Sequence, residues 1–196
     1  MRKLNIGCGP DAMSGWINID NSPNAILSKM PLLKTIFYKI GLLSEQQFNA
    51  KWANHSIFLD VRKGLPFQTA SVDFIYSSHF LEHISQGDAE KLLLECHRVL
   101  KQGGVIHLAL PDLEKAVKRY LSGEDSAEDF VAWTNLSRKN SRHSHKWLCD
   151  SELLEKMLQK VGFVSVKETS AGKSVIPDAQ KLDLRIEDSF FMDAWK

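Results

Sequence analysis

The chain has 196 residues, of which 43% are hydrophobic and 25% charged, and this composition suits one globular domain with a sizeable core. Its net charge of +1 supplies no broad basic field, so we expect no nucleic-acid partner. The cysteines Cys8, Cys96 and Cys149 are odd in number and widely separated, which fits a reducing compartment and offers no zinc-binding spacing. No signal-peptide pattern or membrane-spanning apolar run is visible, so we expect a cytoplasmic single domain over residues 1–196.

Strand patterns alternate with helix patterns along the chain, which predicts an α/β fold with a Rossmann-like, mostly parallel sheet and flanking helices. The expected strands are residues 3–6, 16–19, 56–59, 72–76, 105–110, 163–167 and, as a further candidate, 182–186. The clearest expected helix begins at Asp88 and is ended by Gly103 and Gly104. Further helices are expected at 113–121, 127–139 and 151–161.

An apolar helical insertion is expected over residues 24–54, between the second and third strands. Four interpretations are open: a lid, a peripheral membrane contact through residues 26–43, a homodimer face, or an ordinary packed helix, which is the interpretation we favour. Residues 113–150 form a second region, helical and basic, which we expect to bind the substrate.

A glycine turn, Gly7-Cys8-Gly9, follows the first expected strand, and Asp20 ends the second. Glycine lets a backbone approach a ligand closely, and a carboxylate at the next strand end can accept hydrogen bonds from ribose hydroxyls. These residues predict a nucleoside-binding crevice. The connection over residues 10–15 is too short for a crossover helix, so no helix N-terminus can hold an anionic group there. We therefore expect cofactor binding that is weak or dependent on substrate.

Six motifs occur in the order typical of one enzyme family: Leu-Asn-Ile-Gly-Cys-Gly at 4–9, Gly-Trp-Ile-Asn-Ile-Asp at 15–20, Leu-Asp at 59–60 with Leu-Pro-Phe at 65–67, Ser-Val-Asp at 71–73, Phe-Leu-Glu-His at 80–83, and His-Arg-Val-Leu-Lys at 97–101 before the glycine pair. With them, residues 3–112 resemble the class I S-adenosylmethionine-dependent methyltransferases. The resemblance is strongest to a small subgroup linked to bacterial surface-polysaccharide synthesis. It implies methyl transfer to an oxygen or nitrogen of a small acceptor, such as a nucleotide-linked or lipid-linked sugar.

The resemblance also implies which residues bind S-adenosylmethionine. Its methionine part would be lined by Asn5, Gly7, Cys8 and Gly9, and its ribose would be held by Asp20. The adenine edge would contact Asp60 and the backbone of Val61, and the end of the fourth strand would place Ser77, Ser78 and His79 beneath the cofactor.

Two histidines are candidates for the base that removes the acceptor proton, His79 and His145, although His79 can also be read as a packing residue. Glu82 would orient a neighbour or contact the acceptor, and a structural hydrogen-bonding role is favoured for His83. Trp147 would either stack on a sugar or anchor the core.

A basic loop contains Arg142 and His143, which would recognise a pyrophosphate on the acceptor or simply be solvated. No metal is expected. A non-catalytic methyltransferase-like binding protein is the alternative, favoured by the short first connection. A nucleic-acid methyltransferase is disfavoured by the neutral charge and by Ser-Ser-His-Phe at residues 77–80.

Overall fold

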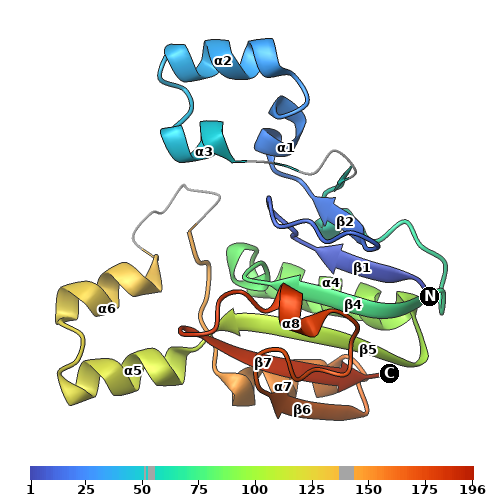
Figure 1. Cartoon of the computed structure of the whole chain (residues 1–196). Helices are drawn as coiled ribbons and strands as arrows, with labels where there is room; N and C mark the ends of the chain where they lie inside the picture. The colour runs from blue at the N-terminus through green and yellow to red at the C-terminus, as the bar shows by residue number, and fades with distance from the viewer. Residues whose placement is uncertain (51, 53–55, 137–143) are drawn as a thin grey trace.

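The computed structural model describes residues 1–50, 52, 56–136 and 144–196. Seven strands form one sheet in the order β3-β2-β1-β4-β5-β7-β6 (Figure 1). The first five strands pair in parallel, whereas β7 is antiparallel to both β5 and β6. The strands are β1 (Lys3–Ile6), β2 (Ile17–Asp20), β3 (Ile57–Phe58), β4 (Val72–Ser78), β5 (Leu100–Pro111), β6 (Ser165–Thr169) and β7 (Ser189–Trp195). The predicted mostly parallel α/β sheet is therefore confirmed.

The helices flank this sheet and extend beyond one of its ends (Figure 1). They are α1 (Pro23–Leu27), α2 (Pro31–Lys39), α3 (Glu45–Asn49), α4 (Gln86–Val99), α5 (Leu113–Ser122), α6 (Ala127–Thr134), α7 (Ser151–Lys160) and α8 (Ala179–Leu182), with 3-10 turns η1 (Val61–Lys63) and η2 (Leu81–His83). The larger hydrophobic core packs residues of α4 and α7 against the sheet. A smaller cluster, which includes residues of α8, also packs on the sheet.

The predicted short connection between β1 and β2 is confirmed, since residues 7–16, all of them described, contain no helix. The buried side chain of Asn18 holds this connection in place. Its amide donates to the carbonyl oxygens of Met13 and Trp16 at 2.9 and 3.0 Å. Its oxygen accepts from the Met13 amide at 3.0 Å and from the side chain of Asn5 at 3.1 Å. One asparagine thus satisfies backbone groups that would be left unpaired in a helix-free connection.

The boundaries of α4 differ from the sequence prediction at both ends. The N-cap is Ser85, whose hydroxyl accepts a hydrogen bond from the amide of Asp88, so Asp88 lies inside the first turn rather than at the cap. The helix ends at Val99, and the glycine pair at 103–104 belongs to β5. The prediction was wrong here because either Ser85 or Asp88 is a good N-cap, and the choice depends on tertiary packing.

The C-terminal part of the chain holds the largest error of the sequence prediction. Residues 182–186 are not a strand, and the strand that was missed is β7. Strand β7 is buried on both faces, including Asp193, so it shows no alternation of polar and apolar residues. Elsewhere, α6 ends earlier than predicted, at Thr134, and β6 begins later, at Ser165.

A buried ionic cluster joins β5 to β7 and to the segment between β6 and β7. Nδ1 of His107 lies 2.6 Å from Oδ1 of Asp193, and Nε2 lies 3.0 Å from Oδ1 of Asp183. Burial alone would lower the pKa of His107, but the two carboxylates outweigh it and raise that pKa to about 9. The charged imidazolium therefore fixes Asp183, which begins the irregular segment 183–188, against the sheet.

The helical insertion is also confirmed, as three short helices at one end of the sheet (Figure 1). Helix α2 packs on α3 through Tyr38 and Phe48, whose stacked rings lie 4.3 Å apart. None of the side chains of α2, all of which are described, is buried. Among the described residues, no helix has both the length and the apolar character needed to cross a membrane.

Candidate cofactor and acceptor site

The carboxyl ends of β1, β2 and β4 meet at one edge of the sheet, where open α/β folds bind ligands. The amide of Gly7, just after β1, donates to the carbonyl oxygen of Ile19 in β2 at 2.8 Å. The hydroxyl of Ser77 in β4 donates to the carbonyl oxygen of Ile6 at 3.0 Å. The structure thus brings together the glycine turn, Asp20 and the end of β4, as the sequence predicted.

Two glycines shape the turn after β1. Both have positive φ, +69° at Gly7 and +54° at Gly9, a region that favours glycine. A Cβ at Gly7 would lie 2.4 Å from the ring of Phe80, so no larger residue fits there. An ideal Cβ at Gly9 would meet no described atom within 4 Å, so the backbone there is open to a ligand. This turn fits the close backbone approach that S-adenosylmethionine binding requires.

The carboxylate of Asp20 is fixed at the end of β2. Its Oδ2 accepts a hydrogen bond from the Gly9 amide at 2.9 Å, and its Oδ1 accepts one from the Ser22 amide at 2.6 Å. Each carboxylate oxygen can accept a second hydrogen bond, so both remain able to receive one from a ribose hydroxyl. The geometry therefore suits the role that the sequence assigned to Asp20.

Asn5, in β1, and Cys8, within the turn itself, both have buried side chains. The Asn5 side chain is buried and donates to Asn18, which places it in support of the turn. The Cys8 thiol is also buried, and burial followed by the nearby Asp20 charge raises its pKa to about 11, so it stays protonated at neutral pH. The sequence predicted cofactor contact for both residues, and that role stays a prediction.

Asp60 caps the turn η1 and pairs with Arg62 through two hydrogen bonds of 2.8 and 2.7 Å. These hydrogen bonds hold the pKa of the Asp60 carboxyl below its usual range. The Leu59 amide donates to the carbonyl oxygen of Asp20, which sets this segment beside β2. An adenine edge at Asp60 would have to share the carboxylate with Arg62, whereas Val61 could contribute its backbone as predicted.

His79 follows β4 in an unusual backbone conformation, with φ of +47°. Its amide donates to the carbonyl oxygen of Ala109, and its Nε2 lies 2.7 Å from the Ser189 hydroxyl. Its Nδ1 lies 3.4 Å from Oε1 of Glu82. Positive φ at a residue with a side chain is strained and tends to persist at functional sites. The observation agrees with a functional position for His79.

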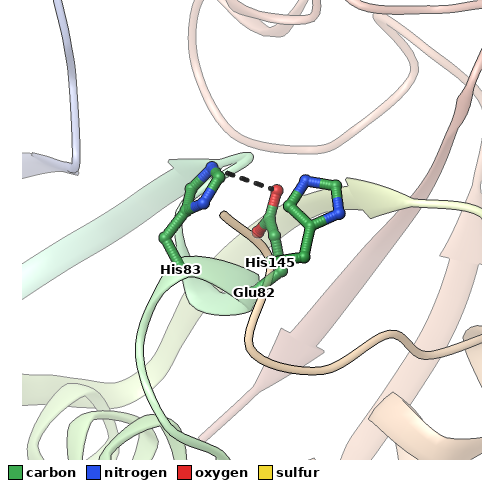
Figure 2. Close-up of side chains that lie close together, drawn as sticks. All are labelled: Glu82, His83 and His145. Carbon is green, nitrogen blue, oxygen red and sulfur yellow. Dashed lines mark ion pairs between the residues drawn. The ribbon is translucent and has the colours of Figure 1, made fainter. Parts of the chain in front are cut away.

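Glu82 lies between the imidazole rings of His83 and His145, as Figure 2 shows. Glu82 and His83 come from η2, and His145 comes from the segment that follows the gap at 137–143. The Nε2 of His83 is 3.9 Å from Oε1 of Glu82, and its Nδ1 is 3.3 Å from the carbonyl oxygen of Ser144. Burial lowers the pKa of His145, so its neutral form predominates at neutral pH.

A cavity of about 570 Å³ opens beside these histidines. This volume lies within the range of about 300–1,000 Å³ that is usual for small-molecule sites. The described residues that line it are His79, Pro111, Trp133, Asn135, His145 and the segment 184–188. Both candidate bases therefore reach one cavity, next to the end of β4.

The structure places Trp147 as an anchor for the segment that carries His145. Its indole Nε1 donates to the carbonyl oxygens of Leu81 and Ile84 at 3.1 and 3.0 Å, and its ring packs on the main core. The sequence left two roles open for Trp147, stacking on a sugar and anchoring the core, and this position matches the second. Arg142 and His143, the predicted substrate-binding residues of the basic loop, lie outside the described residues.

Several lining residues were missed from the sequence. Trp133 and Asn135 fall within the region 113–150 that the sequence assigned to the substrate, but they were not singled out. Residues 184–186 were part of the strand expected at 182–186, and no sequence signal marked the segment 184–188 as a cavity wall. Ser189, the partner of His79, begins strand β7, which the sequence prediction missed.

The comparisons with known proteins agree with this geometry. The sequence profile of the family described as a methyltransferase domain matches residues 4–108, more than half of the chain, so the chain belongs to this family. The search of curated proteins returns no match. The protein is thus an S-adenosylmethionine-dependent methyltransferase, and S-adenosylmethionine is its cofactor.

Solved structures share the fold at low sequence identity. A SAM-dependent methyltransferase from Archaeoglobus fulgidus is 18% identical, with a TM-score of 0.55 over 100% of this chain and 86% of that one. The phosphoethanolamine N-methyltransferase 2 of Haemonchus contortus, solved with phosphomonomethylethanolamine and S-adenosylhomocysteine, is 17% identical, with a TM-score of 0.53 over 100% and 48%. The methyltransferase domain of the citrinin polyketide synthase is 15% identical, with a TM-score of 0.55 over 100% and 46%.

Proposed function

We propose that this methyltransferase transfers a methyl group to an oxygen or nitrogen of a small acceptor, a sugar or sugar conjugate, bound in the cavity beside β4. The observation that carries the proposal is that two histidines, His79 and His145, line one cavity next to the strand ends where we propose that the cofactor binds. The acceptor would therefore lie within reach of both the methyl group and a base.

The residues around β1 and β2 would bind the cofactor. The backbone of Gly7 and Gly9 would lie against its methionine part, Asp20 would accept from its ribose, and Asp60 with Val61 would face its adenine. Ser77 and Ser78, which end β4, would lie beneath it. Bound there, S-adenosylmethionine supplies a methyl group that the adjacent positive sulfur has already activated.

The chain's own contribution to the reaction is alignment and proton removal. His79 is the first candidate base because it lies at the end of β4 and its ring is oriented by Ser189 and Glu82. His145 is the second. The histidine nitrogen would accept the proton as the acceptor oxygen or nitrogen bonds to the methyl carbon, and the sulfur would keep the electron pair of the broken bond.

The sugar class and a place in polysaccharide synthesis rest on the motif resemblance alone. A pyrophosphate on a nucleotide-linked or lipid-linked sugar would suit Arg142 and His143 of the basic loop. A nucleic-acid acceptor is disfavoured by the net charge of +1.

The insertion offers two further partners. Exposed apolar side chains on α2, among them Leu32 and Ile36, together with Lys34 and Lys39, would suit a peripheral membrane contact. A homodimer face is the alternative use of the same surface.

The three cysteines are all buried as free thiols, which suits the cytoplasm. Strands from both ends of the chain share one sheet, which suits a single domain.

A methyl-transfer assay tests the proposal. The protein is incubated with methyl-labelled S-adenosylmethionine and, in turn, nucleotide sugars, free sugars and RNA. We expect label on a sugar-containing acceptor, and a loss of kcat of about 100-fold or more in His79→Gln if His79 is the base. His97→Gln, a change at a half-buried histidine away from the cavity, is the matched control. Label on RNA alone would contradict the proposed acceptor. Full activity in His79→Gln would contradict the assignment of His79 as the base.

A further inference from the structure

The carboxylate of Glu82 is buried without a hydrogen-bond donor. Its side chain is 2% exposed, and neither oxygen accepts a hydrogen bond from any described residue. The nearest nitrogens, Nδ1 of His79 and Nε2 of His83, lie 3.4 and 3.9 Å from Oε1, beyond the usual length of a hydrogen bond. A buried carboxylate is costly unless it is paired or coordinates a metal, and the described residues give this one no hydrogen bond.

His83 turns one ring nitrogen toward that carboxylate (Figure 2). Its Nδ1 lies 3.3 Å from the carbonyl oxygen of Ser144, and a carbonyl oxygen only accepts, so Nδ1 carries a hydrogen. Nε2 is then the ring nitrogen available as a metal ligand, and it lies 3.9 Å from Oε1 of Glu82. This separation leaves room for an ion that both atoms could coordinate.

His145 completes the cluster from the other side of Glu82 (Figure 2). One ligand atom from each of Glu82, His83 and His145 lies within 4.8 Å of the other two. The two imidazole rings are 5.2 Å apart and tilted by 51°, and Nδ1 of His145 is buried with no hydrogen-bond partner in the described part of the chain. One carboxylate and two imidazoles therefore converge within 4.8 Å of one another.

We propose that Glu82, His83 and His145 bind one divalent transition-metal ion, with Zn²⁺ as the best-fitting example. Two imidazoles and a carboxylate form a donor set that zinc uses in sites with an open position. Tetrahedral zinc separates its ligand atoms by about 3.3–3.5 Å, so these side chains would close inward by about 1 Å on binding. The bond from His83 to Ser144 is the kind of outer contact that fixes the ring of a metal ligand.

The open position of this ion would face the acceptor cavity, because His145 also lines it. An ion there would bind an acceptor oxygen and lower the pKa of its hydroxyl, leaving His79 to receive the proton. This role deepens the proposed function and rests on it, whereas metal binding itself does not. The site departs from the expectation of no metal, which was drawn when residues 82–83 and 145 could not be placed side by side.

Metal titration of the full-length protein tests the proposal. After chelator treatment, Zn²⁺ binding is followed by calorimetry, and Co²⁺ binding by its visible absorption. We expect one ion per chain, with affinity at least about tenfold lower in Glu82→Gln and in His145→Asn. The matched controls, Glu90→Gln and His97→Gln, lie outside the cluster and should bind as the wild type does.

Two results would overturn the site. The first is a folded wild type, verified by circular dichroism, that binds no Zn²⁺ or Co²⁺. The second is binding that survives both cluster variants, or Co²⁺ spectra with thiolate charge-transfer bands, which would place the ion at a cysteine. Titration of S-adenosylhomocysteine into the same samples separates the two claims. A protein that binds zinc but not S-adenosylhomocysteine would contradict the proposed function alone. A protein that binds S-adenosylhomocysteine but not zinc would contradict the metal site alone.

Discussion

The buried cluster around His107 makes a quantitative prediction about stability. Replacing His107 by Gln keeps a polar side chain of similar length but removes the positive charge between Asp183 and Asp193. The folded protein raises the pKa of His107 from 6.5 to about 9. At about 1.36 kcal/mol per pKa unit, this difference corresponds to about 3 kcal/mol, close to the usual cost of about 3–5 kcal/mol for breaking a buried ion pair.

The effect depends on pH in a defined direction. Because the folded state binds the proton more tightly than the unfolded state, the contribution of His107 is complete below about pH 6.5 and is lost as the pH rises through about 9. The wild type should therefore lose stability across this window. The His107→Gln variant should not show this part of the decline.

Thermal unfolding followed by circular dichroism measures both effects. For a chain of this size, a loss of about 3 kcal/mol lowers Tm by about 6–12 °C. His97→Gln, at a half-buried histidine outside the cluster, serves as the control and should change Tm little. A His107→Gln variant with the Tm and pH profile of the wild type would refute the charged-cluster interpretation.

Three further substitutions follow from local geometry. Gly7→Ala would force a Cβ to within 2.4 Å of the Phe80 ring at positive φ, so both Tm and S-adenosylhomocysteine affinity should fall, whereas unchanged values would contradict this packing. Asn18→Ala leaves buried partners of the β1–β2 connection unpaired and should cost about 2–3 kcal/mol in urea unfolding. A loss no larger than that of an exposed control, Asn49→Ala, would argue against this role. Hydrogen bonds from Arg98, opposed by partial burial, lower the pKa of Glu95 to about 2. The contribution of Glu95 to folding stability is therefore present above pH 4.5 and lost as the pH falls toward 2. Glu95→Gln should flatten the loss of stability with acid in that window, and an unchanged acid-unfolding profile would contradict this reasoning.

The N-terminal half of the fold was predictable because its signals are local. The glycines after β1, the carboxylate at the end of β2 and the short connection between them all lie within 20 residues, and the structure keeps their order and spacing. The periodic apolar face of α4 also predicted its burial, with an error only at the ends. Such signals can be read from the sequence because backbone conformation and strand ends depend on neighbouring residues.

The proposed acceptor side of the site was less predictable because it depends on contacts between distant residues. Strand β7 contains Asp193, which looks unsuitable for a buried strand until His107 of β5 is placed beside it. Glu82 and His145 become neighbours because the segment 144–147 packs on the turn η2, where Trp147 donates to the carbonyl oxygens of Leu81 and Ile84 and the Lys146 amide donates to that of Glu82. Neither pairing has a sequence spacing that would indicate it.

The most direct test of this account is calorimetric titration of S-adenosylhomocysteine into the purified protein. We predict saturable binding of one molecule per chain, in the micromolar range because the short β1–β2 connection provides no helix N-terminus. Affinity should fall at least about tenfold in Asp20→Asn, and should be unchanged in Asp73→Asn, a carboxylate paired with Lys101 at the surface. No binding by the folded wild type, or equal binding by Asp20→Asn, would contradict the assignment of the cofactor site to this edge of the sheet.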